Sequence, residues 1–224
     1  MNLAERVWPE VGAQLLLVPT GSCEQHGPHL PFDTDTRIAA AVAAGCPGTL
    51  VAPPISYGSS GEHEQFPGTV SIGQEALRTV LVEFGRSACR WASRVVFVNG
   101  HGGNVNALAS AVRLLRYEAR DVAWFSCGAP DGDAHAGRTE TALMLAIDPE
   151  VVRLDRAAAG NTASLRELLP RLREGNLREL SPNGVLGDPA GATTESGQVM
   201  LAGMISRLTT AVDSWQPDKL GRIQ

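Results

Sequence analysis

Most residues in this sequence that could carry hydrolytic chemistry lie in three glycine-rich loops. The first loop reads GSCEQHGPHLPFDTDT, and side chains alternate along an extended segment, so Glu24 and His26 project to the same side. Asp35 follows at the expected start of a helix, where the helix dipole favours a carboxylate. We predict that Glu24, His26 and Asp35 bind Zn, Mn or Fe in the +2 state, with Asp35 as the bridge between two ions. Asp33 is assigned to capping the helix.

The second loop, NGHGGN at residues 99–104, directly follows an apolar run that reads as a strand. Its glycines let the backbone turn sharply and bring His101 close to a bound ion. Phosphate-binding loops are also rich in glycine, but the spacing here fits neither GxxxxGK[ST] nor GxGxxG. The central histidine therefore favours a metal ligand, and we expect Gly102 and Gly103 beside it to contact the substrate.

The third loop, DAHAGRTETALML, contains His135 and, further along, Glu140. A break at Gly137 keeps His135 in the loop while Glu140 enters the first helical turn. Glu140 then completes the ligand set, and His135 is expected to be the catalytic group that transfers a proton. Taken alone, Glu140 also fits a carboxylate that only interacts with the helix dipole.

The charges of the predicted ligands indicate a pair of ions. Three carboxylates are balanced by two divalent cations and a bridging hydroxide, so the site can be buried without a large desolvation penalty. Outside this set, Glu62 and His63 are expected to shape the substrate pocket, with the loop at residues 56–68. Loop packing explains His63 equally well, and His29 is assigned a structural role.

Short apolar runs alternate with helical patterns, which predicts an α/β fold with three layers: a mostly parallel β-sheet flanked by helices. The runs predicted as strands are residues 14–19, 49–53, 94–99 and 122–126. The patterns predicted as helices are residues 35–45, 74–93, 104–120, 139–147 and 195–214. Residues 161–183 fit a helix followed by an extended arm. Because such sheets bind ligands beyond the carboxyl ends of their strands, the three loops should meet there.

Length and composition fit a single domain over residues 1–224. The net charge of -5 argues against a nucleic-acid partner, which needs clustered Lys and Arg. No apolar run approaches the roughly 20 residues of a membrane span, and residues 1–10 lack the pattern of a secretory signal, so we expect a cytoplasmic protein. The four cysteines form no CxxC pair, which indicates free thiols, and Cys23 reads as a small residue in a turn.

Taken together, the loops resemble the creatininase family. The matching motifs are GSCEQHGPHLPFDTDT, YGSSGEHEQFPGTVSI, VFVNGHGGN, HAGRTETALML and GVLGDPAGATTESG. The resemblance implies a creatininase-like fold, two divalent metal ions per subunit (Zn or Fe, with Mn also suitable) and a homo-oligomeric ring of six or eight subunits. Its metal ligands carry over to Glu24, His26, Asp35 and His101. Creatininase itself has a glutamate where this chain has Gly103, and the resemblance then gives the fifth ligand place to Glu140.

Within the family, the phrases SYGSSGEHEQFPGTVSIGQEAL and HAGRTETALML are most similar to members that act on a modified ribosomal peptide. That resemblance implies cleavage of one peptide bond and release of a unit derived from the C-terminal Val-Tyr pair of the modified precursor peptide. Creatinine amidohydrolase is an alternative that Gly103 disfavours. A formylamide deformylase of flavin or deazaflavin synthesis would need cations for a phosphate, and the motif loops offer Arg37 and Arg138. A non-catalytic, metal-stabilised scaffold is the alternative from another class.

Overall fold

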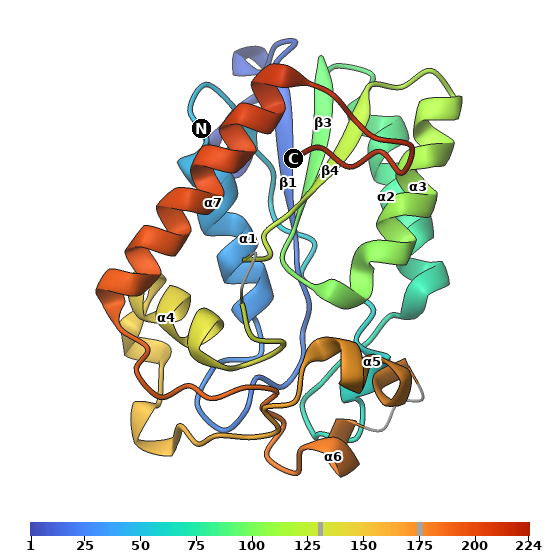
Figure 1. The fold of residues 1–224 in the computed structure, drawn as a ribbon. Coiled ribbons are helices and arrows are strands. Elements are labelled where there is room, and N and C mark those ends of the chain that lie inside the picture. Colours follow the sequence, from blue (N-terminus) through green and yellow to red (C-terminus); the bar gives the residue numbers. More distant parts are fainter. Residues whose placement is uncertain (130–131, 174–176) are drawn as a thin grey trace.

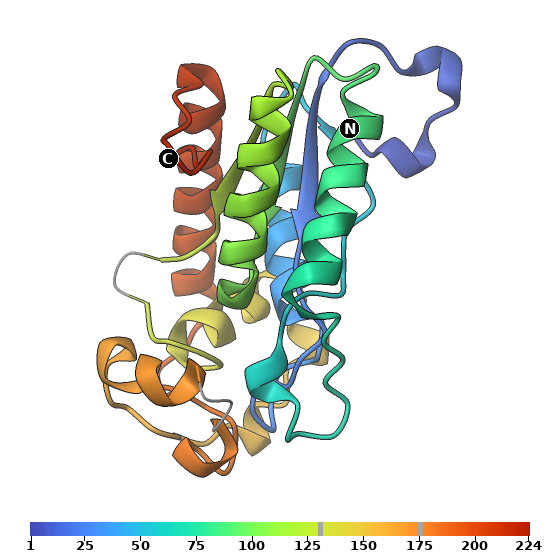
Figure 2. The ribbon, with the colours of Figure 1, turned by 90° about the vertical axis from the view of Figure 1, so that its right-hand side faces the viewer.

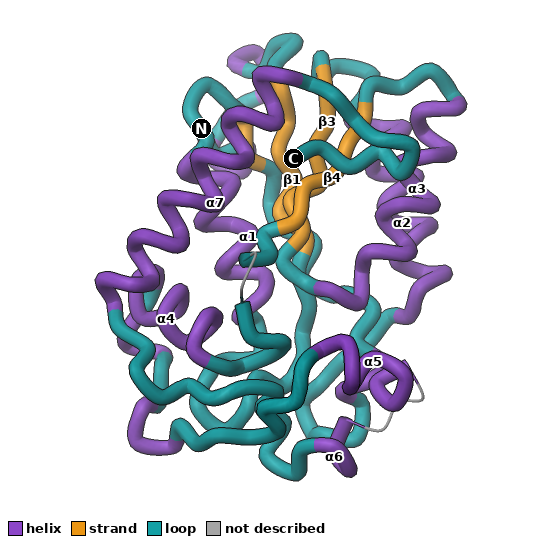
Figure 3. The backbone as a smooth tube through the Cα atoms, viewed as in Figure 1, coloured by secondary structure: helices purple, strands orange, loops and turns teal. Residues whose placement is uncertain are grey.

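Four parallel strands form the centre of the molecule. The computed structural model describes residues 1–129, 132–173 and 177–224. Its sheet has the order β2-β1-β3-β4, with β1 at Leu15–Thr20, β2 at Leu50–Val51, β3 at Arg94–Asn99 and β4 at Val122–Ser126. Each neighbouring pair is parallel, so the carboxyl ends of the strands (orange in Figure 3) lie at one edge of the sheet. The predicted parallel sheet is confirmed.

Helices cover both faces of this sheet. On one face lie α1 (Thr34–Gly45), α4 (Arg138–Ile147) and α7 (Thr194–Ser214). On the other face lie α2 (Gly73–Ala88) and α3 (Val105–Tyr117). Figure 1 shows these two helical layers on either side of the strands. The architecture is therefore the three-layered α/β arrangement that the sequence predicts.

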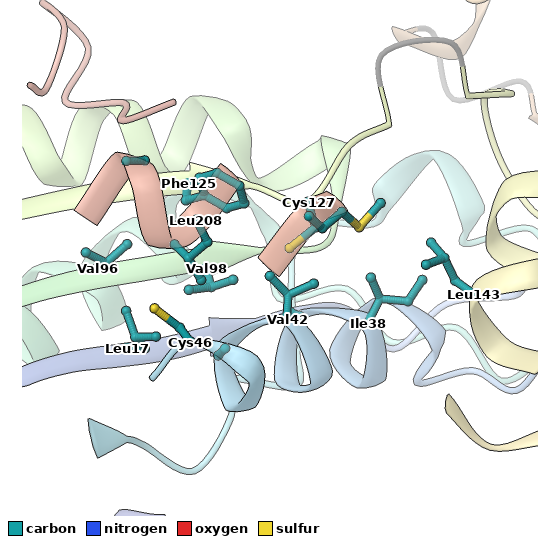
Figure 4. Close-up of a cluster of buried hydrophobic side chains, with 14 of the residues drawn as sticks. Leu17, Ile38, Val42, Cys46, Val96, Val98, Phe125, Cys127, Leu143 and Leu208 are labelled. Carbon is teal, nitrogen blue, oxygen red and sulfur yellow. The ribbon is translucent and has the colours of Figure 1, made fainter. Parts of the chain in front are cut away.

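Successive side chains along each strand point to opposite faces of the sheet, so each helical layer packs on its own hydrophobic core. Leu17 of β1 packs in the core beneath α1, α4 and α7, together with Val98 of β3 and Phe125 of β4 (Figure 4). Leu16 of β1 and Phe97 of β3 face the opposite way and pack against α2 and α3. Because both faces are covered, these strands are apolar along most of their length, as is typical of parallel sheets.

Several predicted elements differ from the observed ones in length, among them β2 and α2. β2 is shorter than predicted because Pro53 and Pro54 follow it, and proline has no N–H to donate to a neighbouring strand. α2 ends at Ala88 rather than at residue 93. Residues after it turn the chain so that Ser93 N donates to Gln14 O at 3.0 Å, just before β3 begins.

Two further helices, α5 (Leu165–Arg173) and α6 (Leu177–Leu180), follow α4. They lie within residues 161–183, where a helix followed by an extended arm was predicted. α5 is such a helix, whereas α6 stands where the arm was expected, so the arm is wrong for the part described; residues 174–176 lie outside it. Figure 2 shows both helices (orange) at the end of the molecule away from the chain termini. The short 3₁₀ helices are Leu3–Glu5, Trp8–Glu10, Gly61–His63, Gly102–Asn104, Pro149–Val151 and Leu154–Arg156. Within the described ranges, none of the helices is long and apolar enough to cross a bilayer.

Candidate metal centre and active-site pocket

The three glycine-rich loops meet around a cavity of about 500 Å³. Glu24 enters it from the loop after β1, and His101 from the loop after β3. Asp35 and Glu140 enter from the first turns of α1 and α4. The cavity therefore lies beyond the carboxyl ends of the strands, as predicted. The structure brings together all five residues predicted as ligands, which are Glu24, His26, Asp35, His101 and Glu140.

Two sets of side chains are spaced to hold one ion each. In each set, the ligand atoms all lie within 4.8 Å of one another. One set is Glu24, Asp35 and His101, and the other is His26, Asp35 and Glu140. Asp35 belongs to both, because its Oδ1 lies 3.3 Å from His26 Nε2 and its Oδ2 lies 3.1 Å from His101 Nδ1. A carboxylate that offers one oxygen to each set can bridge two metal ions.

The other ring nitrogen of each of these histidines contacts a main-chain oxygen. His26 Nδ1 lies 3.1 Å from Glu24 O, and His101 Nε2 lies 3.0 Å from Ser59 O. A carbonyl oxygen only accepts, so these nitrogens carry the proton of the neutral ring. His26 Nε2 and His101 Nδ1 are then free to bind a cation, and their orientation is fixed as in metal-binding histidines generally.

Glu24 supplies the test of whether these residues fit a metal. Its side chain is completely buried, and neither carboxylate oxygen has a hydrogen-bond partner in the described structure. His101 Nε2 lies 3.3 Å from Oε2 but is directed at Ser59 O. Burial acts to raise the pKa of Glu24, yet His101 and His63 lower it to about 2, so the group is ionised. A buried anion without partners is costly, and a bound cation removes that cost, so the site fits divalent ions.

Protons take part in balancing the charge of the metal-free site. Burial acts to lower the pKa of His26, but Asp35 and Glu140 outweigh it and raise the pKa to about 10. Burial raises the pKa of the Glu140 carboxyl to about 7. Asp35 stays ionised, because His26 and His101 overcome its burial and hold its pKa well below the usual range. Metal ions that bind here must displace the protons of the imidazoles.

His135 and His63 lie beside the two ligand sets. The ring centroid of His135 lies 4.3 Å from that of His26 and 4.5 Å from that of His63. His135 Nδ1 is 3.8 Å, and His63 Nε2 3.5 Å, from Glu24 Oε1. The spacing of Glu24, His26 and His135 also suits an ion. His135 is therefore placed either to move a proton next to the metals or to touch one of them.

Two residues of the first loop, His29 and Asp33, are not among the residues that line the cavity. His29 Nε2 lies 2.9 Å from Thr141 Oγ1, which ties this loop to α4. Asp33 directly precedes α1, but its side chain makes no capping hydrogen bond. Its carboxylate instead accepts from Arg37 Nε at 2.7 Å. The prediction that Asp33 caps the helix is wrong, because the guanidinium one turn later takes its oxygen.

Gln25 and Ser22 are polar residues that hold the site and were not predicted. Gln25 is 6% exposed, and its amide nitrogen lies 2.9 Å from His63 Nδ1. Ser22 Oγ donates to Asp35 Oδ2 at 2.8 Å. In the sequence, the signal for both is their position within two residues of Glu24 in the first motif. Their partners are distant in the chain, so the motif alone does not reveal them.

Asp133 fixes the first turn of α4, from which Glu140 projects. Its carboxylate accepts from the main-chain N–H groups of Arg138 and Thr139, the latter at 3.1 Å. Gly137 lies against this carboxylate, and a Cβ at position 137 would overlap Asp133 Oδ2. The chain is extended at Gly137 and helical after it, so the predicted break is present.

The residues predicted to bind substrate also line the cavity. Glu62 Oε1 lies 3.8 Å from His101 Nε2. Gly103 packs against Ser59 O and the His101 ring so closely that a Cβ would overlap both, whereas a Cβ at Gly102 would meet open space. His63 lines the cavity as well. Substrate binding by these residues stays a prediction.

Comparisons with known proteins agree with this geometry. The chain matches the family model described as creatininase, creatinine amidohydrolase, over residues 4–212. It is 57% identical over 216 residues to the mycofactocin precursor peptide peptidase of Mycolicibacterium smegmatis. The matched region covers 92% of this chain and 87% of that protein.

Solved creatininase structures share the fold. A mutant creatininase of Zn-Zn type superposes with a TM-score of 0.76 at 27% identity, covering 97% of this chain and 98% of that chain. A creatininase with Mn superposes with a TM-score of 0.75 at 27% identity, covering 97% and 99%. The family match over most of the chain, the close relative and the shared fold lead to one conclusion: this chain belongs to the creatininase family.

Proposed function

We propose that this chain is a two-metal peptidase that hydrolyses one peptide bond of the mycofactocin precursor peptide. Glu24 carries the proposal, because its buried, ionised carboxylate has no hydrogen-bond partner in the described structure and lies among the candidate ligands. The substrate class is taken from the relative in Mycolicibacterium smegmatis. Cleavage is proposed to release the unit derived from the C-terminal Val-Tyr pair of the modified peptide.

We propose that one ion lies among Glu24, Asp35 and His101, and the other among His26, Asp35 and Glu140. Carboxylate and imidazole ligands accept Zn, Fe and Mn, and the related creatininases with Zn and Mn are consistent with that range. The proposal is therefore two divalent ions per subunit, Zn and/or Fe, with Mn also suitable. Bound there, they would ionise a water near neutral pH and polarise the scissile carbonyl.

His135 is the proposed catalytic residue for proton transfer. It lines the cavity, and its Nδ1 lies 3.8 Å from Glu24 Oε1, beside the proposed ions. Burial, together with the neighbouring His26 and His63, holds the pKa of His135 well below its usual value, so the ring starts neutral. A neutral imidazole can take a proton and pass it to the leaving nitrogen, a contribution of typically about 10²–10⁴-fold.

Apolar side chains form part of the cavity wall. Leu172 of α5, Leu186 and Val105 line it together with the polar groups of the site. Such a mixture suits a peptide with apolar and aromatic side chains, as a Val-Tyr pair provides. The residues proposed to contact the substrate are Glu62, His63, Gly102 and Gly103.

Creatinine hydrolysis is disfavoured by the backbone at position 103. Creatininase has a glutamate there, whereas in this chain even a Cβ at Gly103 would overlap Ser59 O and His101 Nε2. The fold therefore leaves no room for a ligand side chain from this position. Glu140 takes the place of that ligand in the proposed site.

A deformylase that acts on a phosphate-bearing substrate needs a free cation at its pocket. Arg37 is held by Asp33 and Asp148, both at 2.7 Å, and Arg138 donates to Ala190 O at 2.9 Å. Among the residues that the structure describes, the cavity is lined by neither Lys nor Arg. This lining favours the peptide over a phosphate-bearing substrate.

The test is mass spectrometry of the metal-loaded protein with the modified precursor peptide, the unmodified precursor and creatinine in separate reactions. The proposal expects a C-terminal fragment from the modified peptide. Ring opening of creatinine without peptide cleavage would show that the chain is a creatinine amidohydrolase and that the peptidase proposal is wrong. If the peptide is cut elsewhere, the peptidase assignment stands and the proposed product is wrong.

Comparing a His135→Ala variant with the wild type distinguishes the enzyme hypothesis from that of a metal-stabilised scaffold. The enzyme hypothesis expects two bound ions and lost cleavage, because the ring moves a proton during the reaction. A scaffold without turnover shows no cleavage in the wild type either. We also propose a cytoplasmic homo-oligomer of six or eight subunits, which light scattering with mass determination tests.

A further inference from the structure

Gln25 lies at the centre of a hydrogen-bond network that joins two histidines of the site. Its Oε1 accepts from Gly27 N at 2.8 Å. Its Nε2 lies 3.0 Å from Gly184 O and 2.9 Å from His63 Nδ1. Because Gly27 N can only donate and Gly184 O can only accept, the orientation of the amide is determined by its partners.

The main-chain oxygen of the same residue holds the second histidine. Gln25 O lies 2.8 Å from His135 Nε2. Since the oxygen has no hydrogen, Nε2 must carry the proton of the neutral ring; the other tautomer would bring two lone pairs together at this distance. Gln25 Nε2 also approaches His135 Nε2, at 3.1 Å, but both are then donors. The second amide hydrogen therefore goes to His63 Nδ1.

These two contacts fix which nitrogen of each ring faces Glu24. His63 accepts at Nδ1 and so carries its proton on Nε2, 3.5 Å from Glu24 Oε1. His135 donates from Nε2 and so keeps a lone pair on Nδ1, 3.8 Å from the same oxygen. One ring thus faces the buried carboxylate with an N–H group, outside hydrogen-bond geometry, while the other faces the cavity with a lone pair.

We propose that Gln25 is a positioning residue for hydrolysis, because it fixes the tautomers of His63 and His135 and thereby turns the Nδ1 lone pair of His135 toward the metal pocket. This inference rests on the proposed function, in which His135 moves a proton. Hydrolysis consumes one water: its oxygen forms the new C–O bond, and the C–N bond breaks. One proton of that water passes through His135 Nδ1 to the leaving nitrogen. With the proton on Nδ1 instead, the ring could not begin this transfer.

The direct test is ¹⁵N solid-state NMR of the zinc-loaded enzyme with labelled histidine, which distinguishes protonated from unprotonated ring nitrogens at any oligomer size. The signals of His63 and His135 are assigned from His63→Asn and His135→Asn variants. The proposal expects both rings to carry the proton on Nε2. A His135 ring with its proton on Nδ1 overturns it, and this result needs neither a substrate nor a folded Gln25 variant.

The functional test compares Gln25→Met with Gln65→Met, an exposed glutamine in the same loop as His63. Gln25→Met removes the amide that fixes His63 and keeps the main-chain oxygen that holds His135. It is expected to keep both zinc ions and its KM for the modified precursor, while kcat falls by about 10- to 100-fold, as for other residues that orient catalytic groups. The reason is that a His63 ring in the other tautomer would face Glu24 with a lone pair and disturb the His135 ring, whose centroid lies 4.5 Å away. Its His63 ring is expected to show mixed tautomers. Gln65→Met should match the wild type throughout.

An unchanged kcat together with an unchanged His63 tautomer in a folded Gln25→Met enzyme would overturn the proposal. If that variant loses its zinc or does not fold, the wild-type tautomers decide. A wild type that does not cleave the peptide at all contradicts the proposed function instead, and the two failures are therefore distinguishable.

Discussion

The backbone of Gly103 packs against the main-chain oxygen of Ser59 so closely that position 103 has no room for a Cβ. The same Cβ would overlap His101 Nε2, the nitrogen that is directed at Ser59 O at 3.0 Å. The contact between Gly103 and Ser59 therefore sets the position of a candidate metal ligand. It joins the loop before α2 to the loop before α3 at the mouth of the site.

Gly103→Ala is expected to displace His101, because the new methyl group and the Ser59 oxygen cannot both keep their places. Such overpacking typically costs about 1–3 kcal/mol in the free energy of unfolding. We expect that loss in urea unfolding of the metal-free protein, together with a reduced metal content by elemental mass spectrometry. Gly102→Ala is the matched control for both measurements, since a Cβ there meets open space. Equal stability and metal content of the two variants would contradict the packing argument.

Asp35→Asn is expected to lower the occupancy of both ions, because Asp35 belongs to both ligand sets. Glu140→Gln should lower the occupancy of one ion, since Glu140 belongs to a single set. The measurement is metal content per chain after dialysis against a weak chelator. Two ions retained in Asp35→Asn would rule out its role as the bridge.

Metal affinity should rise with pH. Although burial opposes it, Asp35 and Glu140 raise the pKa of His26 to about 10, so the ring is protonated at pH 7 in the metal-free protein. A metal binds the neutral ring, so binding releases this proton and strengthens as the pH approaches 10. Calorimetric titration with zinc in two buffers of different ionisation enthalpy counts the protons. Binding without proton release would contradict the assignment of His26.

The contribution of His26 to the stability of the metal-free protein should fall as the pH rises, whereas the metal affinity should increase. His26 has a pKa that is raised from 6.5 to about 10 on folding. Its contribution is therefore fully present below pH 6.5 and is lost as the pH rises through about 10. The difference between the urea midpoints of wild type and His26→Asn, both in chelator, should shrink over this window. A difference that grows with pH would show that the sign is wrong.

Leu172→Ala is expected to weaken substrate binding without affecting the metals, because Leu172 lines the cavity from α5 and is not one of the proposed ligands. Removing part of an apolar wall should raise KM for the peptide by about 10-fold and leave kcat unchanged. Steady-state kinetics with the modified precursor measure both. Leu154→Ala, at a position 52% exposed, is the control. A fall in kcat at constant KM would contradict a binding role for Leu172.

Much of this architecture could be predicted from the sequence because the strands are buried on both faces. Continuous apolar runs such as residues 94–99 are a strong local signal, and they predict β3 with its observed bounds. Glu24, His26 and His101 were predicted for a similar reason, since they lie in glycine-rich loops directly after such runs.

What could not be predicted depends on contacts between distant segments. The role of Gln25 in the site depends on its contacts with residues 63, 135 and 184, which only the folded chain brings together. Asp133 caps α4 across a glycine rather than from the adjacent position, so the usual capping pattern does not reveal it. Asp33 is the opposite case: it directly precedes α1, where a capping residue is expected, but its carboxylate accepts from the Arg37 guanidinium instead.

The packing of α7 along α4 has a consequence for how the protein is made. α4 supplies Glu140, and the helix that covers it, α7, is the last helix of the described chain (Figure 1). A ribosome therefore delivers every proposed ligand well before the segment that supports α4 has been translated. Nascent chains would lack the finished ligand set, so we expect metal to bind completed subunits rather than growing ones.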